Sequence, residues 1–241
     1  MSGRPVLIAA VHGTRDGRDR PVIEALLGQV RALRPGLVVR PAYLQFAAPS
    51  VSSALVQAGG RAVVVPLLLS AGYHLRADLP AAVYTARAAV GPEAEFALAP
   101  ALGPHRLLAD ALVDRLHQAG WRPGTPIVLA AAGSTDARAI VDIRGMVRLL
   151  AERTRVQVAV GFAAGNSPTV ADSVARLRGT GTGAVAVASY LIAPGQFHDV
   201  AAAAGAQAVG GPIADHPALA RLVLERYDVA VPATHELLIV P

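Results

Sequence analysis

Short apolar runs alternate along the chain with longer segments of helical pattern. The runs are rich in valine, leucine and alanine, and they predict eight strands, at about residues 4–11, 37–44, 61–69, 94–99, 125–131, 156–162, 184–191 and 206–210. Several of them, such as Ala62 to Leu69, are apolar without interruption, which is typical of strands buried on both faces of a parallel sheet. Strands that alternate with helices favour an α/β fold with helices on both faces of the sheet.

Proline beside an acidic or hydroxyl residue marks several helix starts. Asp19 precedes Pro21 and Asp78 precedes Pro80, while Pro49-Ser50 opens a predicted helix at 50–58 and Ser167-Pro168 opens one at 168–178.

The two halves of the chain resemble each other at an offset of roughly 120 residues. VLIAAVHGTRD, from Val6 to Asp16, aligns with PIVLAAAGSTD, from Pro126 to Asp136. A period of this length indicates a duplicated domain. We therefore expect two similar α/β lobes, each a mainly parallel sheet flanked by helices. The expected division is residues 1–122 and 123–241, with the cleft between the lobes as the ligand site.

Composition excludes several classes of chemistry. The chain has 241 residues and no cysteine, and all 22 basic residues are arginine. Cysteine nucleophiles, thiolate metal sites and lysine-based phosphate or Schiff-base sites are therefore excluded. The net charge of +5 is spread along the chain, and aromatic residues make up only 4%, which argues against nucleic-acid binding. No run is long enough to span a bilayer, and the N-terminus lacks a signal-peptide cleavage pattern, so we expect a cytoplasmic protein.

Two histidines follow predicted strands of the first half. His12 comes directly after the first strand, and His74 lies five residues beyond the third. Ligands of open α/β sheets bind beyond the carboxyl ends of the strands, so these side chains are candidates for chemistry. The repeat supplies a comparison, because Ala132 stands at the position of His12 while the glycine turn is kept. The turn therefore does not need a histidine.

Four motifs can be compared with known families. They are AVHGTRD from Ala10, AYLQ from Ala42, VPLLLSAGYH from Val65 and, as a degenerate counterpart, YLIAPGQFHD from Tyr190. Together they resemble the sirohydrochlorin chelatases of the long, two-lobed type, the class II chelatases of siroheme and cobalamin synthesis. The resemblance covers essentially the whole chain.

The resemblance implies a role for each motif. His12 would be the proton acceptor and a metal ligand, and His74 the second metal ligand. The segment Leu69, Ser70, Ala71, Gly72 and Tyr73 would line the macrocycle. Arg15 and Arg76 are the arginines closest in sequence to the two histidines, and they would be suitable partners for the carboxylates of the substrate. Gln45 stands where many members have a glutamate, and an amide cannot accept a proton at neutral pH.

The predicted function is insertion of a divalent metal into sirohydrochlorin, without an organic cofactor or ATP. Fe²⁺ is the metal that we favour. Both lobes are on one chain, so a monomer would already contain a complete cleft. Two alternatives remain open: a cobalt-inserting chelatase of cobalamin synthesis, and a non-catalytic carrier of tetrapyrrole or metal. His198 is a further candidate for facing the cleft, although its lobe has lost the partner histidine.

Overall fold

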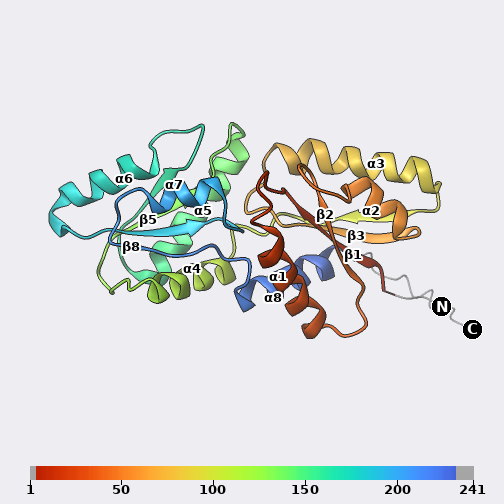
Figure 1. The fold of residues 1–241 in the computed structure, drawn as a ribbon, viewed down its shortest axis with the longest axis horizontal. Helices are drawn as coiled ribbons and strands as arrows, with labels where there is room; N and C mark the ends of the chain where they lie inside the picture. Colours follow the sequence, from red (N-terminus) through yellow and green to blue (C-terminus); the bar gives the residue numbers. More distant parts are fainter. Residues whose placement is uncertain (1–3, 232–241) are drawn as a thin grey trace, which may run out of the picture.

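Two four-stranded parallel sheets lie side by side in the computed structural model, which describes residues 4–231 (Figure 1). The first has the order β2-β1-β3-β4 and the second β6-β5-β7-β8. The strands are β1 (Val6–Val11), β2 (Val39–Tyr43), β3 (Arg61–Pro66), β4 (Glu95–Leu98), β5 (Ile127–Ala131), β6 (Val158–Phe162), β7 (Ala186–Tyr190) and β8 (Ala208–Val209). The predicted fold class, duplicated α/β lobes with parallel sheets, is confirmed.

Helices cover both faces of each sheet. They are α1 (Arg20–Leu33), α2 (Val51–Gln57), α3 (Leu79–Val90), α4 (Arg106–Gln118), α5 (Ala137–Thr154), α6 (Val170–Leu177), α7 (Gln196–Ala202) and α8 (Pro217–Ala230), with π-helical turns at His74–Asp78 and Arg178–Thr182. One apolar core runs through both lobes, from Leu7 and Val11 in the first sheet to Leu129 and Ala188 in the second. Two smaller cores lie under α2–α3 and under α6–α7. No helix in the described part of the chain is long and apolar enough to cross a membrane.

The last helix of each half packs on the sheet of the other half (Figure 1). Helix α4 lies against β7 and α5, whereas α8 lies against α1 and β3. The chain therefore crosses between the lobes at residues 99–105 and again at 210–216. The division into residues 1–122 and 123–241 stays a prediction about the repeat, and in space each of these segments ends in a helix that completes its neighbour.

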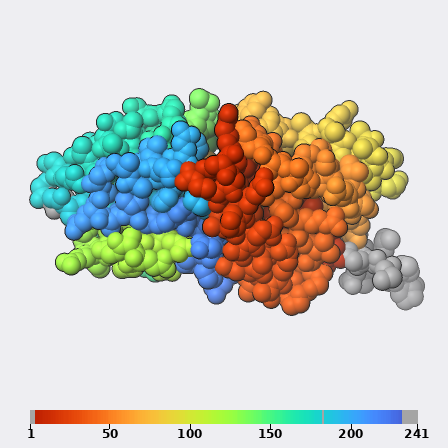
Figure 2. All heavy atoms as spheres, in the orientation of Figure 1, coloured from red at the N-terminus to blue at the C-terminus, as the bar shows by residue number. Residues whose placement is uncertain are grey.

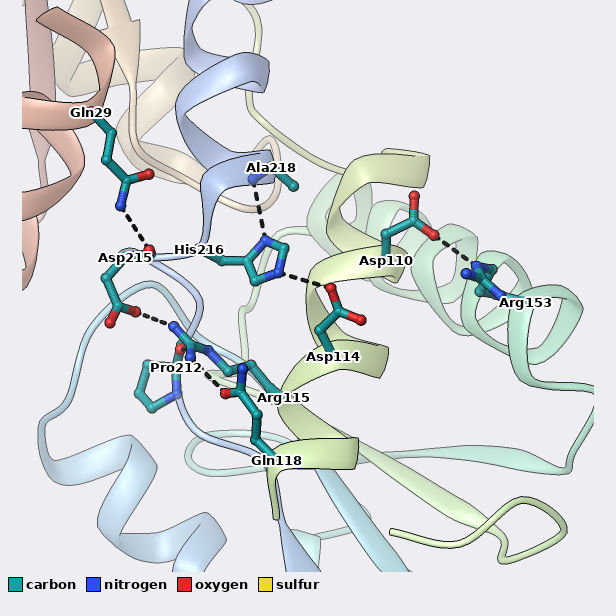
Figure 3. Close-up of polar contacts among 10 residues, drawn as sticks. All are labelled: Gln29, Asp110, Asp114, Arg115, Gln118, Arg153, Pro212, Asp215, His216 and Ala218. Carbon is teal, nitrogen blue, oxygen red and sulfur yellow. Dashed lines mark hydrogen bonds and ion pairs between the residues drawn. The ribbon is translucent and has the colours of Figure 1, made fainter. Parts of the chain in front are cut away.

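Polar contacts fix the second crossing (Figure 3). Nδ1 of His216 accepts a hydrogen bond from the amide of Ala218, and its Nε2 lies 3.1 Å from the carboxylate of Asp114 on α4. Arg115 donates to the carbonyl of Pro212, at 3.0 Å. His105 caps α4 in the same way that His216 caps α8, through the amide of Leu107. These two histidines are therefore structural.

The structure differs from the expected elements at several points. Helix α6, expected at 168–178 from Ser167-Pro168, spans Val170–Leu177 and is capped by Thr169. The third strand ends at Pro66 rather than near residue 69, because only Leu67 continues the ladder, donating to the carbonyl of Ala10. Asp19 and Asp78 precede α1 and α3, but neither side chain caps its helix. Ser50, by contrast, caps α2 as its position suggests.

Candidate functional site

His12 and His74 meet at the carboxyl end of the first sheet. His12 follows β1 and His74 begins the π-helical turn that follows the loop after β3, and these two strands are neighbours in the sheet. The two imidazole rings have centroids 4.8 Å apart and are inclined at 76°. The parallel topology therefore brings together two residues separated by 61 intervening positions.

Each ring uses one nitrogen for its own orientation. Nδ1 of His12 lies 2.9 Å from the carbonyl oxygen of Gly13, and Nδ1 of His74 lies 2.5 Å from a carboxylate oxygen of Asp78. With these acceptors the proton of each neutral ring sits on Nδ1, which leaves the Nε2 lone pair of each ring for a metal or a proton.

The loop that carries His12 has a geometry that only glycine permits. Gly13 has a φ of +88°, and a Cβ at this position would lie 2.2 Å from the carbonyl oxygen of Gln45. The backbone N–H of Gln45 in turn donates to the backbone carbonyl of His12, at 3.0 Å. Further along the loop, the Thr14 hydroxyl donates to the buried carboxylate of Asp19, at 2.8 Å. Gln45 itself is exposed beside the histidine loop.

The predicted macrocycle-lining segment is held by the second lobe. The carbonyl of Leu69 accepts a 2.7 Å hydrogen bond from the hydroxyl of Tyr190, and the amide of Ala71 donates to Asp142, at 2.8 Å. Ser70 lies between these two hydrogen-bonded residues and Gly72 follows them, and both are partly exposed. Tyr73 is 63% exposed, and its ring centroid lies 6.3 Å from that of His74.

The two arginines named from the sequence have different surroundings. Arg15 is exposed, and its guanidinium carbon lies 5.0 Å above the ring of Phe46. Arg76 forms an ion pair across the lobes with Asp136, at 2.7 Å. Hydrogen bonds from the Arg138 amide and from Arg76 lower the pKa of Asp136. Arg76 is therefore engaged in an ion pair between the lobes, whereas Arg15 lies over the ring of Phe46.

A second ion pair joins the lobes near His12. Arg18 binds Asp199 of α7 with both terminal nitrogens, at 3.0 and 2.7 Å. Figure 2 shows the segment after β1, in red, lying against blue atoms of the second lobe at the junction of the two lobes. A hollow of about 240 Å³ also lies at the junction, lined by Val22, Arg115, Ile192, Pro194, Gly211, Pro212, Ala214 and Asp215, none of which is a predicted site residue.

His198 does not join the histidine pair. Its Nδ1 lies 3.2 Å from the hydroxyl of Ser189 inside the second lobe, and burial lowers its pKa. Counting on from the paired strands, the second-lobe residues that correspond to His12 and His74 are Ala132 and Phe197. The second lobe therefore keeps the frame of the site without its imidazoles.

Two residues beside the histidines have no local signal in the sequence for their position. The sequence predicts Asp78 only as a helix start, and Phe46 belongs to none of its motifs. Within residues 4–231, no group of three or more His, Asp or Glu side chains is arranged to hold a metal ion. Two imidazoles are thus the nitrogen donors that this site offers.

The chain is similar to known proteins both in its sequence pattern and in its fold. The model of the CbiX family matches residues 6–119 and again residues 126–230. Among solved structures, SirB from Bacillus subtilis with Fe³⁺ is 21% identical, with a TM-score of 0.78, over 95% of this chain and 96% of that one. SirB from Bacillus subtilis subspecies spizizenii in complex with cobalt is 18% identical, with a TM-score of 0.75 and 95% of each chain covered.

A further structure is that of CbiX, described as the terminal enzyme for biosynthesis of siroheme in denitrifying bacteria. It is 26% identical, with a TM-score of 0.68, over 94% of this chain and 99% of that one. No curated protein matches the sequence. Because the family model matches both repeats and together they span most of the sequence, the chain belongs to the CbiX family.

Proposed function

We propose that this protein is a cytoplasmic sirohydrochlorin chelatase that inserts Fe²⁺ into the macrocycle during siroheme biosynthesis. The observation that carries the proposal is the pair of imidazoles, 4.8 Å apart, whose Nδ1 atoms are both engaged by acceptors. The CbiX family match over both repeats supports the same chemistry.

The reaction exchanges two protons for one metal ion. Fe²⁺ loses water and binds four pyrrole nitrogens, and two pyrrole N–H groups give up their protons. His12 accepts the two pyrrole protons one after the other at Nε2 and passes each to solvent, since this residue is exposed. His74 binds the incoming metal through Nε2, and His12 shares the metal before the proton transfer.

Weak metal binding suits this task. A structural site with four ligands would retain the ion, whereas two imidazoles can release it to the macrocycle. Asp78 holds His74 in one tautomer and orientation, as an outer carboxylate does for many metal-binding histidines.

The macrocycle would lie against Leu69, Ser70, Ala71, Gly72 and Tyr73, with Arg15 pairing with a peripheral carboxylate. Gln45 would contribute a neutral carbonyl oxygen at the position of the usual glutamate, which leaves the site one negative charge poorer. As both lobes are on one chain, the proposed active form is a monomer without an organic cofactor.

A second candidate is cobalt insertion in cobalamin synthesis. One of the similar SirB structures holds Fe³⁺ and another holds cobalt, so the fold accommodates either element. Imidazole donors alone do not discriminate between Fe²⁺ and Co²⁺.

The test is anaerobic absorbance of sirohydrochlorin with Fe²⁺ and then Co²⁺. Wild-type protein should accelerate insertion over the uncatalysed background, and His12→Ala and His74→Ala should both abolish the acceleration. His117→Ala, an exposed histidine on α4, is the control and should keep full activity. The ratio of the two metal rates decides between iron and cobalt. Macrocycle binding without acceleration for either metal would overturn the proposal in favour of a carrier.

A further inference from the structure

Phe46 is an exposed aromatic residue in a backbone conformation that disfavours it. Its φ is +62°, and its side chain is 47% exposed. Bulky side chains rarely adopt this left-handed region, and residues that do so cluster at functional sites. The loop around it is closed by two backbone hydrogen bonds. The N–H of Gln45 donates to the carbonyl of His12, and the N–H of Tyr43 donates to the carbonyl of Pro49. Phe46 therefore stands at the tip of a fixed turn.

The second lobe contains the same turn without the aromatic ring. The amide of Ala164 donates to the carbonyl of Ala132, just as Gln45 donates to His12, so Gly165 is the counterpart of Phe46. Gly165 has a φ of +70°, and a Cβ there would meet nothing within 4 Å. The turn is thus built with glycine in the lobe that lacks the two imidazoles, and the first lobe places a phenylalanine in the same conformation. The fold does not require this ring.

The ring lies where a ligand of the histidines would meet it. Its centroid is 6.2 Å from that of His12, with the planes inclined at 46°, and the Arg15 guanidinium carbon lies 5.0 Å from its centre. The second-lobe counterpart of Arg15 is Thr135, so the cation and the ring occur together in the first lobe and are both absent from the second. An apolar ring and a cation side by side match a flat π-system with a carboxylate at its rim.

We propose that Phe46 is a macrocycle-binding residue, whose ring contacts the edge of the tetrapyrrole and holds Arg15 in place for a peripheral carboxylate. This inference rests on the proposed function, since it takes sirohydrochlorin as the ligand. Phe46 acts on the macrocycle and not on the metal, so it affects macrocycle affinity and leaves metal binding by the histidines unchanged.

The sharpest variant is Phe46→Gly, which copies the second lobe. Glycine relieves the left-handed backbone, so the melting temperature should equal or exceed that of the parent. Loss of the ring should weaken binding of metal-free sirohydrochlorin, followed by fluorescence, about tenfold. The KM for sirohydrochlorin should rise by a similar factor with kcat nearly unchanged, and Phe46→Trp should restore the affinity.

Arg15→Gln tests the coupling between the two side chains. It should weaken macrocycle binding in the parent and have a smaller effect in the Phe46→Gly background, because the guanidinium has then lost its support. Tyr84→Ala, which removes an exposed aromatic ring from α3, is the matched control and should change neither quantity. Co²⁺ binding without macrocycle should be equal in all these variants.

The outcomes separate this inference from the proposed function. If the parent inserts metal and Phe46→Gly has the parent's affinity and KM for sirohydrochlorin, the proposed role of Phe46 is wrong, and the proposed chelatase function is unaffected. If the parent binds the macrocycle without inserting metal, the affinities still decide the role of Phe46. If the parent does not bind sirohydrochlorin, both proposals fall.

Discussion

The carboxylate of Asp78 lies 2.5 Å from Nδ1 of His74, four residues earlier in the chain. Asp78 immediately precedes α3, yet its carboxylate accepts no hydrogen bond from the first backbone N–H groups of that helix. Its side chain instead fixes the imidazole that lies beside His12, so one residue both ends the π-helical turn and orients His74.

Removing that charge should impair the site without unfolding it. In Asp78→Asn the amide can no longer act as a carboxylate acceptor for the ring N–H, so the tautomer and orientation of His74 are less well defined. We expect kcat/KM for metal insertion to fall about 10- to 100-fold. Asp110→Asn, on the exposed side of α4 and paired with Arg153, should change it little. Equal activity in both variants would contradict a positioning role for Asp78.

Asp19 shows the same departure from the expected capping. Its carboxylate is 2% exposed and accepts the hydroxyl of Thr14 in the histidine loop. A cap signal depends on neighbouring residues in the sequence and marks the helix start correctly. The partner that a carboxylate finally takes depends on how the preceding loop folds back, which local sequence does not record. The starts of these two helices were therefore predictable, and the two side-chain contacts were not.

The eight strands and the histidine pair were within reach of the sequence for a different reason. Buried parallel strands leave uninterrupted apolar runs, and their carboxyl ends lie at one edge of the sheet. Phe46 carried no such pattern, because a positive φ at phenylalanine leaves no periodic trace. Its alignment with Gly165 in the repeat was the signal that could have found it. The packing of α4 and α8 on the sheet of the other half has no comparable signal in the sequence.

Gly13 and Gly36 separate backbone strain from steric overlap. Both have positive φ, +88° and +84°, but only a Cβ at Gly13 would strike the Gln45 carbonyl. Gly36→Ala should lower the free energy of unfolding by about 1–2 kcal/mol and leave activity intact. Gly13→Ala should cost more, because the backbone of the loop must also move, and should displace His12. Denaturant unfolding measures the free energy of unfolding of each variant, and metal-insertion rates measure its activity. Similar losses of stability and activity in Gly13→Ala and Gly36→Ala would refute the steric argument.

The hydroxyl of Tyr190 joins the second lobe to the segment that carries Leu69. Tyr190→Phe leaves the Leu69 carbonyl without this donor, and we expect a loss of about 1–3 kcal/mol in the free energy of unfolding. Tyr227→Phe is a close control, because its buried hydroxyl donates to the carbonyl of Pro5, also at 2.7 Å, away from the site. Both should destabilise, but only Tyr190→Phe should raise the KM for sirohydrochlorin.

The ion pair of Arg18 with Asp199 should respond to salt and not to mild acid. Hydrogen bonding by Arg18 lowers the pKa of Asp16 to about 2 and also lowers the pKa of Asp199. A lowered carboxyl pKa adds stability above the ordinary value of 3.8, which is lost only as the pH falls through the lowered pKa. These exposed charges are, however, screened by salt.

X-ray scattering in solution can follow this contact. The radius of gyration should stay constant from pH 9 down to about pH 4 and should increase at high salt. Arg18→Gln should show the larger radius already at low salt. Arg34→Gln, which breaks the ion pair between Arg34, the residue after α1, and Asp228 of α8 beside the same sheet, should not. A radius independent of salt in the parent would show that the pair does not hold the lobes.

The exchange of α4 and α8 makes each half of the chain dependent on the other for its folding. Cut at residue 122, the first fragment would keep a helix that belongs on the other sheet and lose the one that covers its own, and the core shared by both lobes would be open on each side. Heat should therefore melt the two sheets in a single calorimetric transition, so that the duplicated halves behave as one cooperative unit.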